Sequence, residues 1–139
     1  YQMPALLKRV DFISVGSNDL FQFLFASDRG SPKVSERFDP LSPAGLAFLK
    51  SIVDQCNTTQ MPISLCGEMA GRPLDAMALI GIGFRSLSMA PSSIGPVKTM
   101  IRSLSVSELR LHLDSIKNIV EHSLREQLHQ FAIERGVIV

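Results

Sequence analysis

The sequence has 139 residues, of which 45% are hydrophobic and 19% charged, with 9 glycines, 8 prolines and a formal net charge of +1. This composition excludes an intrinsically disordered, collagen-like or low-complexity chain. The near-neutral charge and the lack of a basic tract give no reason to expect nucleic acid or an anionic membrane as a partner. The longest apolar run, residues 77–84, is far shorter than the ~20 residues that span a bilayer, so we expect no membrane protein.

The cysteine content and the start of the chain indicate its setting. Two cysteines, Cys56 and Cys66, are too few for the disulfide framework of a small secreted domain, and no signal segment opens the chain. We therefore expect a reducing, cytoplasmic environment. Because the chain opens at Tyr1 and residues 1–10 read as a continuation, we also expect a fragment of a longer protein.

Strands and helices are predicted to alternate along the first hundred residues. Short β-branched and apolar segments closed by glycine or proline predict three strands, over residues 10–15, 62–66 and 85–89. Apolar spacing predicts helices over residues 43–57, 74–82 and 93–103, the first with Ser42 as N-cap and Pro43 at its first position. Residues 31–42 read as a surface loop. This alternation predicts parallel βαβ units and an α/β fold.

The pattern changes after residue 104. Residues 105–108 (SVSE) have the sequence of a capping box, and two helices are predicted, over residues 107–114 and 116–135, the second ended by Gly136. All three histidines lie in this region: His112, His122 and His129. His122 and His129 are seven residues apart and would share a helix face, and we interpret all three as surface residues.

The carboxyl ends of parallel strands are where such sheets bind ligands. Polar or reactive residues follow all three predicted strands, at residues 16–19 (GSND), 66–68 (CGE) and 88–90 (SMA). No glycine-rich nucleotide loop and no zinc-ligand spacing occurs in the sequence. The predicted site is therefore a strand-end site without a known nucleotide motif.

Each candidate residue at these ends has two interpretations. Asn18 and Asp19 suit a phosphate and a Mg²⁺ ion, or residues 17–19 (Ser-Asn-Asp) cap the next helix, and both can be true together. Arg29 has donors suited to phosphate or carboxylate, or it is a solvated turn residue. Cys66 is a buried small hydrophobe, or it is a proton donor or an activated nucleophile beside Gly67, which would let a ligand approach the backbone closely.

Two further acidic or thiol groups favour structural interpretations. Glu68 could be a metal ligand or an acid/base, but it reads best as a first-turn acid of a helix. Cys56 falls inside the helix predicted over residues 43–57 and reads as structural.

Two long motifs in order resemble the C-terminal phosphoenolpyruvate-binding domain of Enzyme I of the bacterial phosphotransferase system. The resemblance rests on residues 11–22 (DFISVGSNDLFQ), 26–29 (ASDR) and 65–71 (LCGEMAG) and extends nearly end to end. Ser17 and residues 37–41 (RFDPL) look more like the nitrogen-related branch of the family than the sugar-transport branch.

The resemblance implies a fold and an activity. It implies the last three βα units of a TIM (β/α)₈ barrel, residues 1–104, followed by a C-terminal helical extension, residues 105–139; whole barrels need about 250 residues. Enzyme I transfers the phosphoryl group of phosphoenolpyruvate, with Mg²⁺, to its own histidine and then to a histidine phosphocarrier protein, releasing pyruvate. A homodimer is also implied.

The resemblance also assigns roles residue by residue. Asn18 would contact the phosphate, Asp19 would bind Mg²⁺ and substrate, Arg29 would bind phosphoryl oxygens, and Cys66 would protonate the enolate carbon. The family's phosphorylated histidine lies in a Thr-Ser-His context that is absent here, so no histidine of this chain inherits that role. A second Mg²⁺ carboxylate and two substrate arginines would precede Tyr1, so we expect the fragment alone to be inactive.

Two alternatives remain open at this point. Pyruvate phosphate dikinase and phosphoenolpyruvate synthase have similar Asn-Asp and Cys-Gly-Glu motifs. A non-catalytic module that self-associates through its C-terminal helices and open sheet edges is the alternative from another class.

Overall fold

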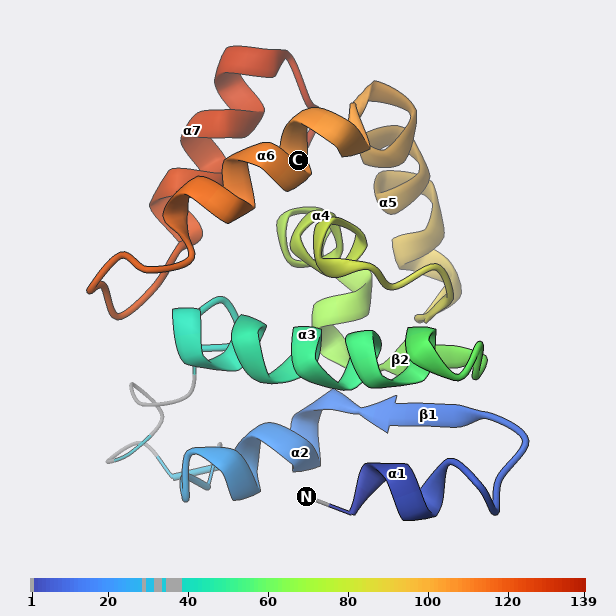
Figure 1. Cartoon of the computed structure of the whole chain (residues 1–139). Coiled ribbons are helices and arrows are strands. Elements are labelled where there is room, and N and C mark those ends of the chain that lie inside the picture. Colours follow the sequence, from blue (N-terminus) through green and yellow to red (C-terminus); the bar gives the residue numbers. More distant parts are fainter. Residues whose placement is uncertain (1, 29, 32–33, 35–38) are drawn as a thin grey trace.

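Within the residues that the structure describes, three parallel strands form an open sheet in the order β1-β2-β3. The computed structural model describes residues 2–28, 30–31, 34 and 39–139. The strands are β1 (Ile13–Gly16), β2 (Ile63–Cys66) and β3 (Leu87–Ser88). Helices connect them, which confirms the predicted α/β fold with parallel strands (Figure 1).

The helices follow the strands in the predicted alternation. In chain order they are α1 (Met3–Leu6), α2 (Ser17–Leu24), α3 (Pro43–Thr58), the 3₁₀ helix η2 (Glu68–Gly71), α4 (Pro73–Ile82), α5 (Pro91–Ser103), α6 (Val106–Ile116) and α7 (Arg125–Arg135). The short helix α1 was not predicted. Half of the loop predicted over residues 31–42, namely 32–33 and 35–38, lies outside the described residues.

The predicted start of α3 is confirmed in detail. Ser42 is its N-cap and accepts a hydrogen bond from the backbone N–H of Gly45 at 3.1 Å, and Pro43 occupies the first turn. One face of the helix carries Leu46, Leu49 and Val53 into the core. The periodic apolar spacing therefore specified both the helix and its buried face.

The strands are shorter than predicted because pairing limits them. β1 begins at Ile13, three residues later than expected, since β2 begins at Ile63 and offers no partner for the preceding residues. β3 has two residues instead of five, because only Leu87 and Ser88 pair with β2. Sequence patterns mark extended chain, whereas a strand also needs a partner on the sheet.

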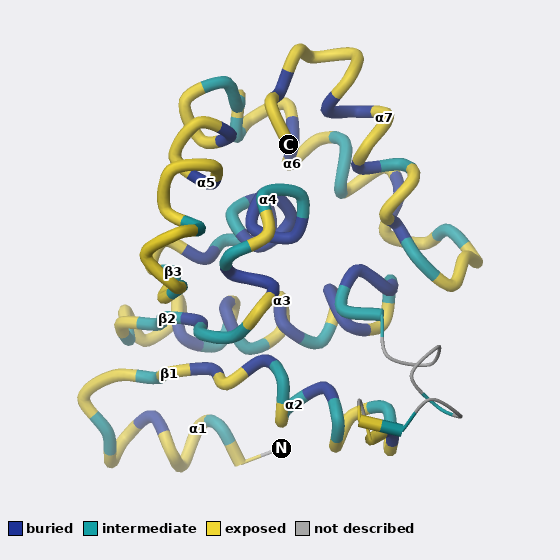
Figure 2. The backbone as a smooth tube through the Cα atoms, turned by 180° about the vertical axis from the view of Figure 1, so that it is seen from behind, coloured by how far each residue is buried: buried dark blue, intermediate teal, exposed yellow. Residues whose placement is uncertain are grey.

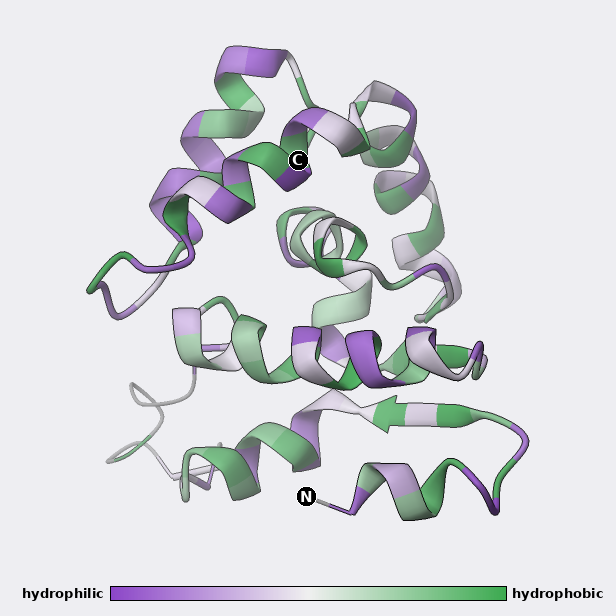
Figure 3. Cartoon of the chain, in the orientation of Figure 1, coloured by the Kyte–Doolittle hydropathy of each residue, from purple (hydrophilic) through white to green (hydrophobic). Residues whose placement is uncertain are grey.

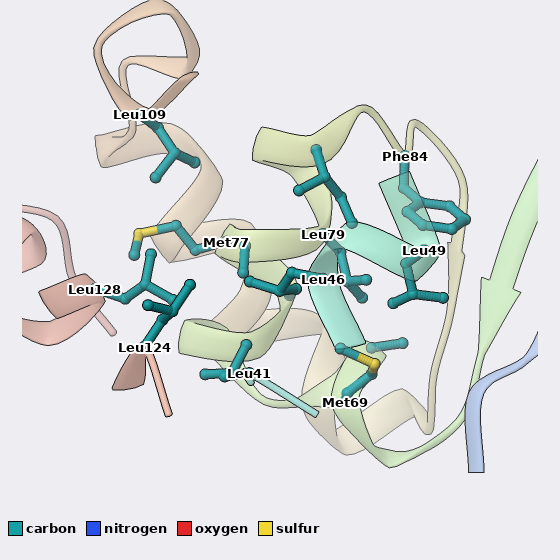
Figure 4. Close-up of a cluster of buried hydrophobic side chains, with 14 of the residues drawn as sticks. Leu41, Leu46, Leu49, Met69, Met77, Leu79, Phe84, Leu109, Leu124 and Leu128 are labelled. Atoms are coloured by element: carbon teal, nitrogen blue, oxygen red, sulfur yellow. The ribbon is translucent and has the colours of Figure 1, made fainter. Parts of the chain in front are cut away.

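Helix α4 lies at the centre of the molecule. Its residues are apolar nearly all round, and seven of its ten are buried (Figure 2). It packs against α3, α5, α6 and α7. Figure 4 shows Met77 and Leu79 of α4 among side chains from other elements, including Leu49, Leu109 and Leu128. A helix that is hydrophobic on every face is stable only when covered in this way.

The C-terminal region differs from the prediction. One helix was expected over residues 116–135, but α6 ends at Ile116 and α7 begins at Arg125. The break returns the chain to the core: Leu124 is buried, and its N–H donates to the carbonyl of Leu41 at 2.8 Å. The connection brings α6 and α7 side by side over α4 (Figure 1), and their exposed faces are largely hydrophilic (Figure 3).

Smaller predictions in this region fare differently. The predicted capping box does not form. Ser105 makes no cap hydrogen bond, and its hydroxyl contacts that of Ser107 at 3.2 Å. The end of α7 at Gly136, with φ 64°, is confirmed. Among the described residues, no helix has the length and apolar character needed to cross a membrane.

The predicted surface histidines are confirmed only in part. His122 and His129 are exposed, but His122 precedes α7, so the two do not share a helix face. His112 is half-buried and stacks on Phe131 with ring centroids 4.8 Å apart. His112 is therefore a packing residue and was wrongly interpreted as a surface one.

Candidate active site

The carboxyl ends of the three strands lie in one row. The register places Gly16 opposite Cys66, and Cys66 opposite Ser88. Each strand therefore delivers its following loop to the same edge of the sheet. This juxtaposition is the one predicted from the sequence, and it gathers the polar residues that follow β1, β2 and β3.

A side-chain hydrogen bond holds the ends of β1 and β2 together. The Ser17 hydroxyl, which is buried, donates to the carbonyl oxygen of Cys66 at 3.0 Å. Gly67 makes this contact possible, because a Cβ at that position would collide with Ser17 Oγ and lie 3.1 Å from Asn18 Oδ1. Its φ of 129° is also a conformation that side chains disfavour. The two motifs are thus in direct contact.

The capping interpretation of the residues after β1 is wrong. Helix α2 begins at Ser17, its N-cap is Gly16, and no side chain makes a cap hydrogen bond. Asn18 and Asp19 lie in the first turn instead. Their side chains are therefore not used to cap the helix, and the first-turn position favours the acidic Asp19.

A pocket of ≈ 570 Å³ opens at these strand ends. Its lining includes Asn18 from α2, Glu68 beside β2, and residues 88–90 beyond β3. Asn18 is half-buried and Glu68 is exposed. All three predicted strand-end clusters contribute, so the structure combines them into one concave site of a size that suits a small ligand.

The other candidate residues are placed less directly. Asp19 is exposed and not among the lining residues, and its Oδ1 accepts a long hydrogen bond of 3.5 Å from Gln22. Cys66 is half-buried and its side chain is outside the lining set, although its neighbour Gly67 belongs to it. Arg29 lies outside the described residues.

The second cysteine is structural, as predicted. Cys56 is fully buried in α3, and burial raises the pKa of its thiol above the ordinary value. A buried thiol with a raised pKa forms little thiolate and reacts slowly.

The residues fit a Mg²⁺ ion only as part of a coordination set. In the part of the chain that the structure describes, no group of three or more His, Cys, Asp or Glu side chains could hold a metal. Asp19 offers one exposed carboxylate at the strand ends. Mg²⁺ is commonly held by one or two carboxylates together with substrate phosphates and water, so one carboxylate is compatible with it.

Arg72 is a pocket residue that the sequence reasoning missed. It lines the pocket with Glu68, and its Nη1 lies 3.7 Å from Oδ2 of the fully buried Asp75. The residues singled out from the sequence near β2 end at Glu68, four positions before Arg72. A cation just before Pro73, at the start of a helix on the same sheet edge, was the available signal.

Asp75 also connects the pocket to the C-terminal helices. Its Oδ1 accepts a hydrogen bond from Arg125 Nη1 at 3.1 Å, and Arg125 Nη2 lies 3.7 Å from Asp39. Burial raises the pKa of Asp75, and the charges of Arg125 and then Arg72 oppose that rise. Oδ2 has no hydrogen-bond partner among the described residues.

Comparison with known proteins decides the family. Residues 1–106 match the family described as "PEP-utilising enzyme, PEP-binding domain". The chain belongs to this family. It is 40% identical over 138 residues to the Escherichia coli protein "Phosphoenolpyruvate-dependent phosphotransferase system", covering 99% of this chain and 18% of that protein. It is 36% identical over 126 residues to "Phosphoenolpyruvate-protein phosphotransferase" of Borreliella burgdorferi, covering 91% and 22%.

Membership confirms the resemblance inferred from the two motifs. The PEP-binding match spans β1, β2 and β3 and all the strand-end residues that line the pocket. The chain spans about a fifth of the length of these curated relatives.

Proposed function

We propose that this PEP-binding domain supplies part of the substrate site of a phosphoenolpyruvate-protein phosphotransferase. In this reaction the phosphoryl group of phosphoenolpyruvate passes to a histidine of the enzyme and then to a phosphocarrier protein, and pyruvate is released. The observation that carries the proposal is the direct contact between the two motifs at Gly67, beside a pocket that Asn18 lines. The TIM-barrel architecture and a homodimer belong to the same proposal.

The residues of this chain would divide the work as follows. The Asn18 amide donates to a phosphate oxygen, and Arg29 binds further phosphoryl oxygens. Asp19 holds Mg²⁺, which neutralises phosphoryl charge when bound. Cys66 delivers a proton to the enolate carbon after the phosphoryl group has left, and this completes pyruvate. Such a site acts by positioning and electrostatic stabilisation.

Phosphoryl transfer tests the proposal. The native polypeptide that carries these residues is mixed with Mg²⁺ and radiolabelled phosphoenolpyruvate, with and without phosphocarrier protein. We expect label on a histidine of the enzyme, then on the carrier, without ATP. Asn18→Ala removes one donor to the charged phosphate, so the transfer rate is expected to fall ~100-fold.

The control is Asn57→Ala, which removes an exposed amide at the far end of α3 and leaves the rate unchanged. Failure of the wild-type protein to take label from phosphoenolpyruvate would overturn the proposal. A strict requirement for adenine nucleotide would instead assign the protein to the pyruvate phosphate dikinase or phosphoenolpyruvate synthase reactions.

A further inference from the structure

The pocket at the strand ends has an unusual charge balance for an anion site. Among its described lining residues only Glu68 and Arg72 are charged. The Glu68 carboxylate repels a ligand that carries phosphate and carboxylate groups. Within the described lining, Arg72 is therefore the cation available to offset this repulsion.

The backbone of Arg72 is fixed, while its guanidinium donors stay available to a ligand. It is the residue that precedes α4, and its backbone carbonyl accepts a hydrogen bond from Ala76 at 2.8 Å, so its backbone is fixed. Its Nη1 lies 3.7 Å from Asp75 Oδ2, which is beyond hydrogen-bonding distance. The side chain is 60% exposed. The guanidinium donors are thus oriented by attraction and remain able to bind a ligand.

Asp75 attracts Arg72 but does not need it as a hydrogen-bonded counterion, because Arg125 has that role. Arg125 donates to Oδ1 at 3.1 Å, so one carboxylate oxygen already has a charged hydrogen-bond partner. The other oxygen is fully buried, has no hydrogen-bond partner in the described part of the chain, and faces Arg72. A planar guanidinium placed in this way can bind an oxyanion with two parallel hydrogen bonds.

We propose that Arg72 is a substrate-binding residue of this site, contacting an anionic group of phosphoenolpyruvate, and that Asp75 is a positioning residue that acts through it. The inference rests on the proposed function and adds a contact that none of the sequence motifs assigned. It predicts that substrate affinity depends on the Arg72 guanidinium, whereas the phosphoryl-transfer step depends on it much less.

Steady-state kinetics of the native polypeptide test this inference. Arg72→Ala is expected to raise KM for phosphoenolpyruvate ~10- to 100-fold with a small change in kcat, the loss typical of one charge-assisted hydrogen bond. Arg72→Lys keeps the charge but not the planar fork, so its KM is expected to lie between the two. Arg102→Ala, at an exposed arginine in the last turn of α5, is the matched control and keeps the wild-type KM.

A double-mutant cycle tests the role of Asp75. If Asp75 acts through Arg72, Asp75→Asn raises KM in the wild-type background but not in the Arg72→Ala background. Pyruvate affinity identifies the anionic group: it falls in Arg72→Ala if Arg72 binds the carboxylate, and stays constant if Arg72 binds the phosphate. The thermal midpoint of each variant monitors folding.

An unchanged KM in a folded Arg72→Ala protein would overturn the inference and leave the proposed function intact. Failure of the wild-type protein to use phosphoenolpyruvate would overturn the proposed function itself. The two failures are thus distinguishable.

Discussion

At the scale of single residues, Gly67 determines whether the two motifs can meet. Its position directly after β2 predicted a glycine that lets a ligand approach the backbone, whereas the structure places Ser17 and Asn18 against it. Asn18 also lines the pocket, and its contact with phosphate stays a prediction. The missing cap hydrogen bond could not be predicted, because it depends on Ser17 reaching the carbonyl of Cys66, 49 residues away in the chain.

Substitution of Gly67 by alanine is expected to separate the strand ends. A Cβ there meets Ser17 Oγ, and the φ of 129° lies in a region that side chains rarely adopt. The free energy of unfolding should fall by roughly 1–3 kcal/mol, and phosphoryl transfer should fall with it. Denaturant unfolding of the native polypeptide measures the first effect.

Gly16→Ala is the control for this prediction. Gly16 ends β1 at the same sheet edge, but no atom of the described residues lies within 4 Å of a Cβ built there. We expect a much smaller change in unfolding free energy. Equal losses for the two variants would show that close packing at Gly67 is not what matters.

At the scale of elements, the break between α6 and α7 is a feature that sequence periodicity does not reveal. Residues 116–135 are consistent with one helix, yet Leu124 buries its side chain in the core and donates its backbone N–H to the carbonyl of Leu41, which separates α6 from α7. Local patterns correctly located α3 and α4. They missed the break before α7 because its cause lies in residues distant in sequence.

Arg125→Ala is expected to destabilise the fold in a pH-dependent way. It removes the hydrogen-bonding counterion of buried Asp75, while Arg72 remains 3.7 Å away and Arg125 itself is 44% exposed. We expect a loss of ~2 kcal/mol near neutral pH, less than for a fully buried pair. The control is Lys117→Ala, which breaks an ion pair with Asp114 whose side chains are 62% and 63% exposed. It should lower the free energy of unfolding by under ~1 kcal/mol.

The sign of the pH effect follows from the raised pKa of Asp75. Between its unfolded pKa of 3.8 and its higher folded pKa, the folded state binds more protons, so stability falls as pH rises. Removing Arg125 raises the folded pKa further and extends this window upward. The loss of unfolding free energy caused by Arg125→Ala should therefore become smaller as the pH is lowered. A deficit that is constant across pH in urea unfolding would contradict this account.

At the scale of the whole molecule, the sheet is open on both sides. Among the residues that the structure describes, β1 and β3 each pair only with β2, and an apolar groove of ≈ 610 Å³ lies beside β3, between α4 and α5. Composition gave no sign of this, because 45% hydrophobic residues are ordinary for a closed domain. An open apolar groove and sheet edge favour association with further protein, which fits both the proposed barrel and a self-associating module.

The proposed function requires that phosphoenolpyruvate binds at the carboxyl ends of β1, β2 and β3. Cys66 is the natural reporter, because it is half-buried at this edge, whereas Cys56 is fully buried and serves as an unreactive internal control. The rate of Cys66 alkylation by iodoacetamide is measured by mass spectrometry of its peptide in the native polypeptide. We predict that phosphoenolpyruvate with Mg²⁺ slows alkylation several-fold in the wild type and not in Asn18→Ala. Equal alkylation rates with and without saturating phosphoenolpyruvate would contradict binding of phosphoenolpyruvate at these strand ends.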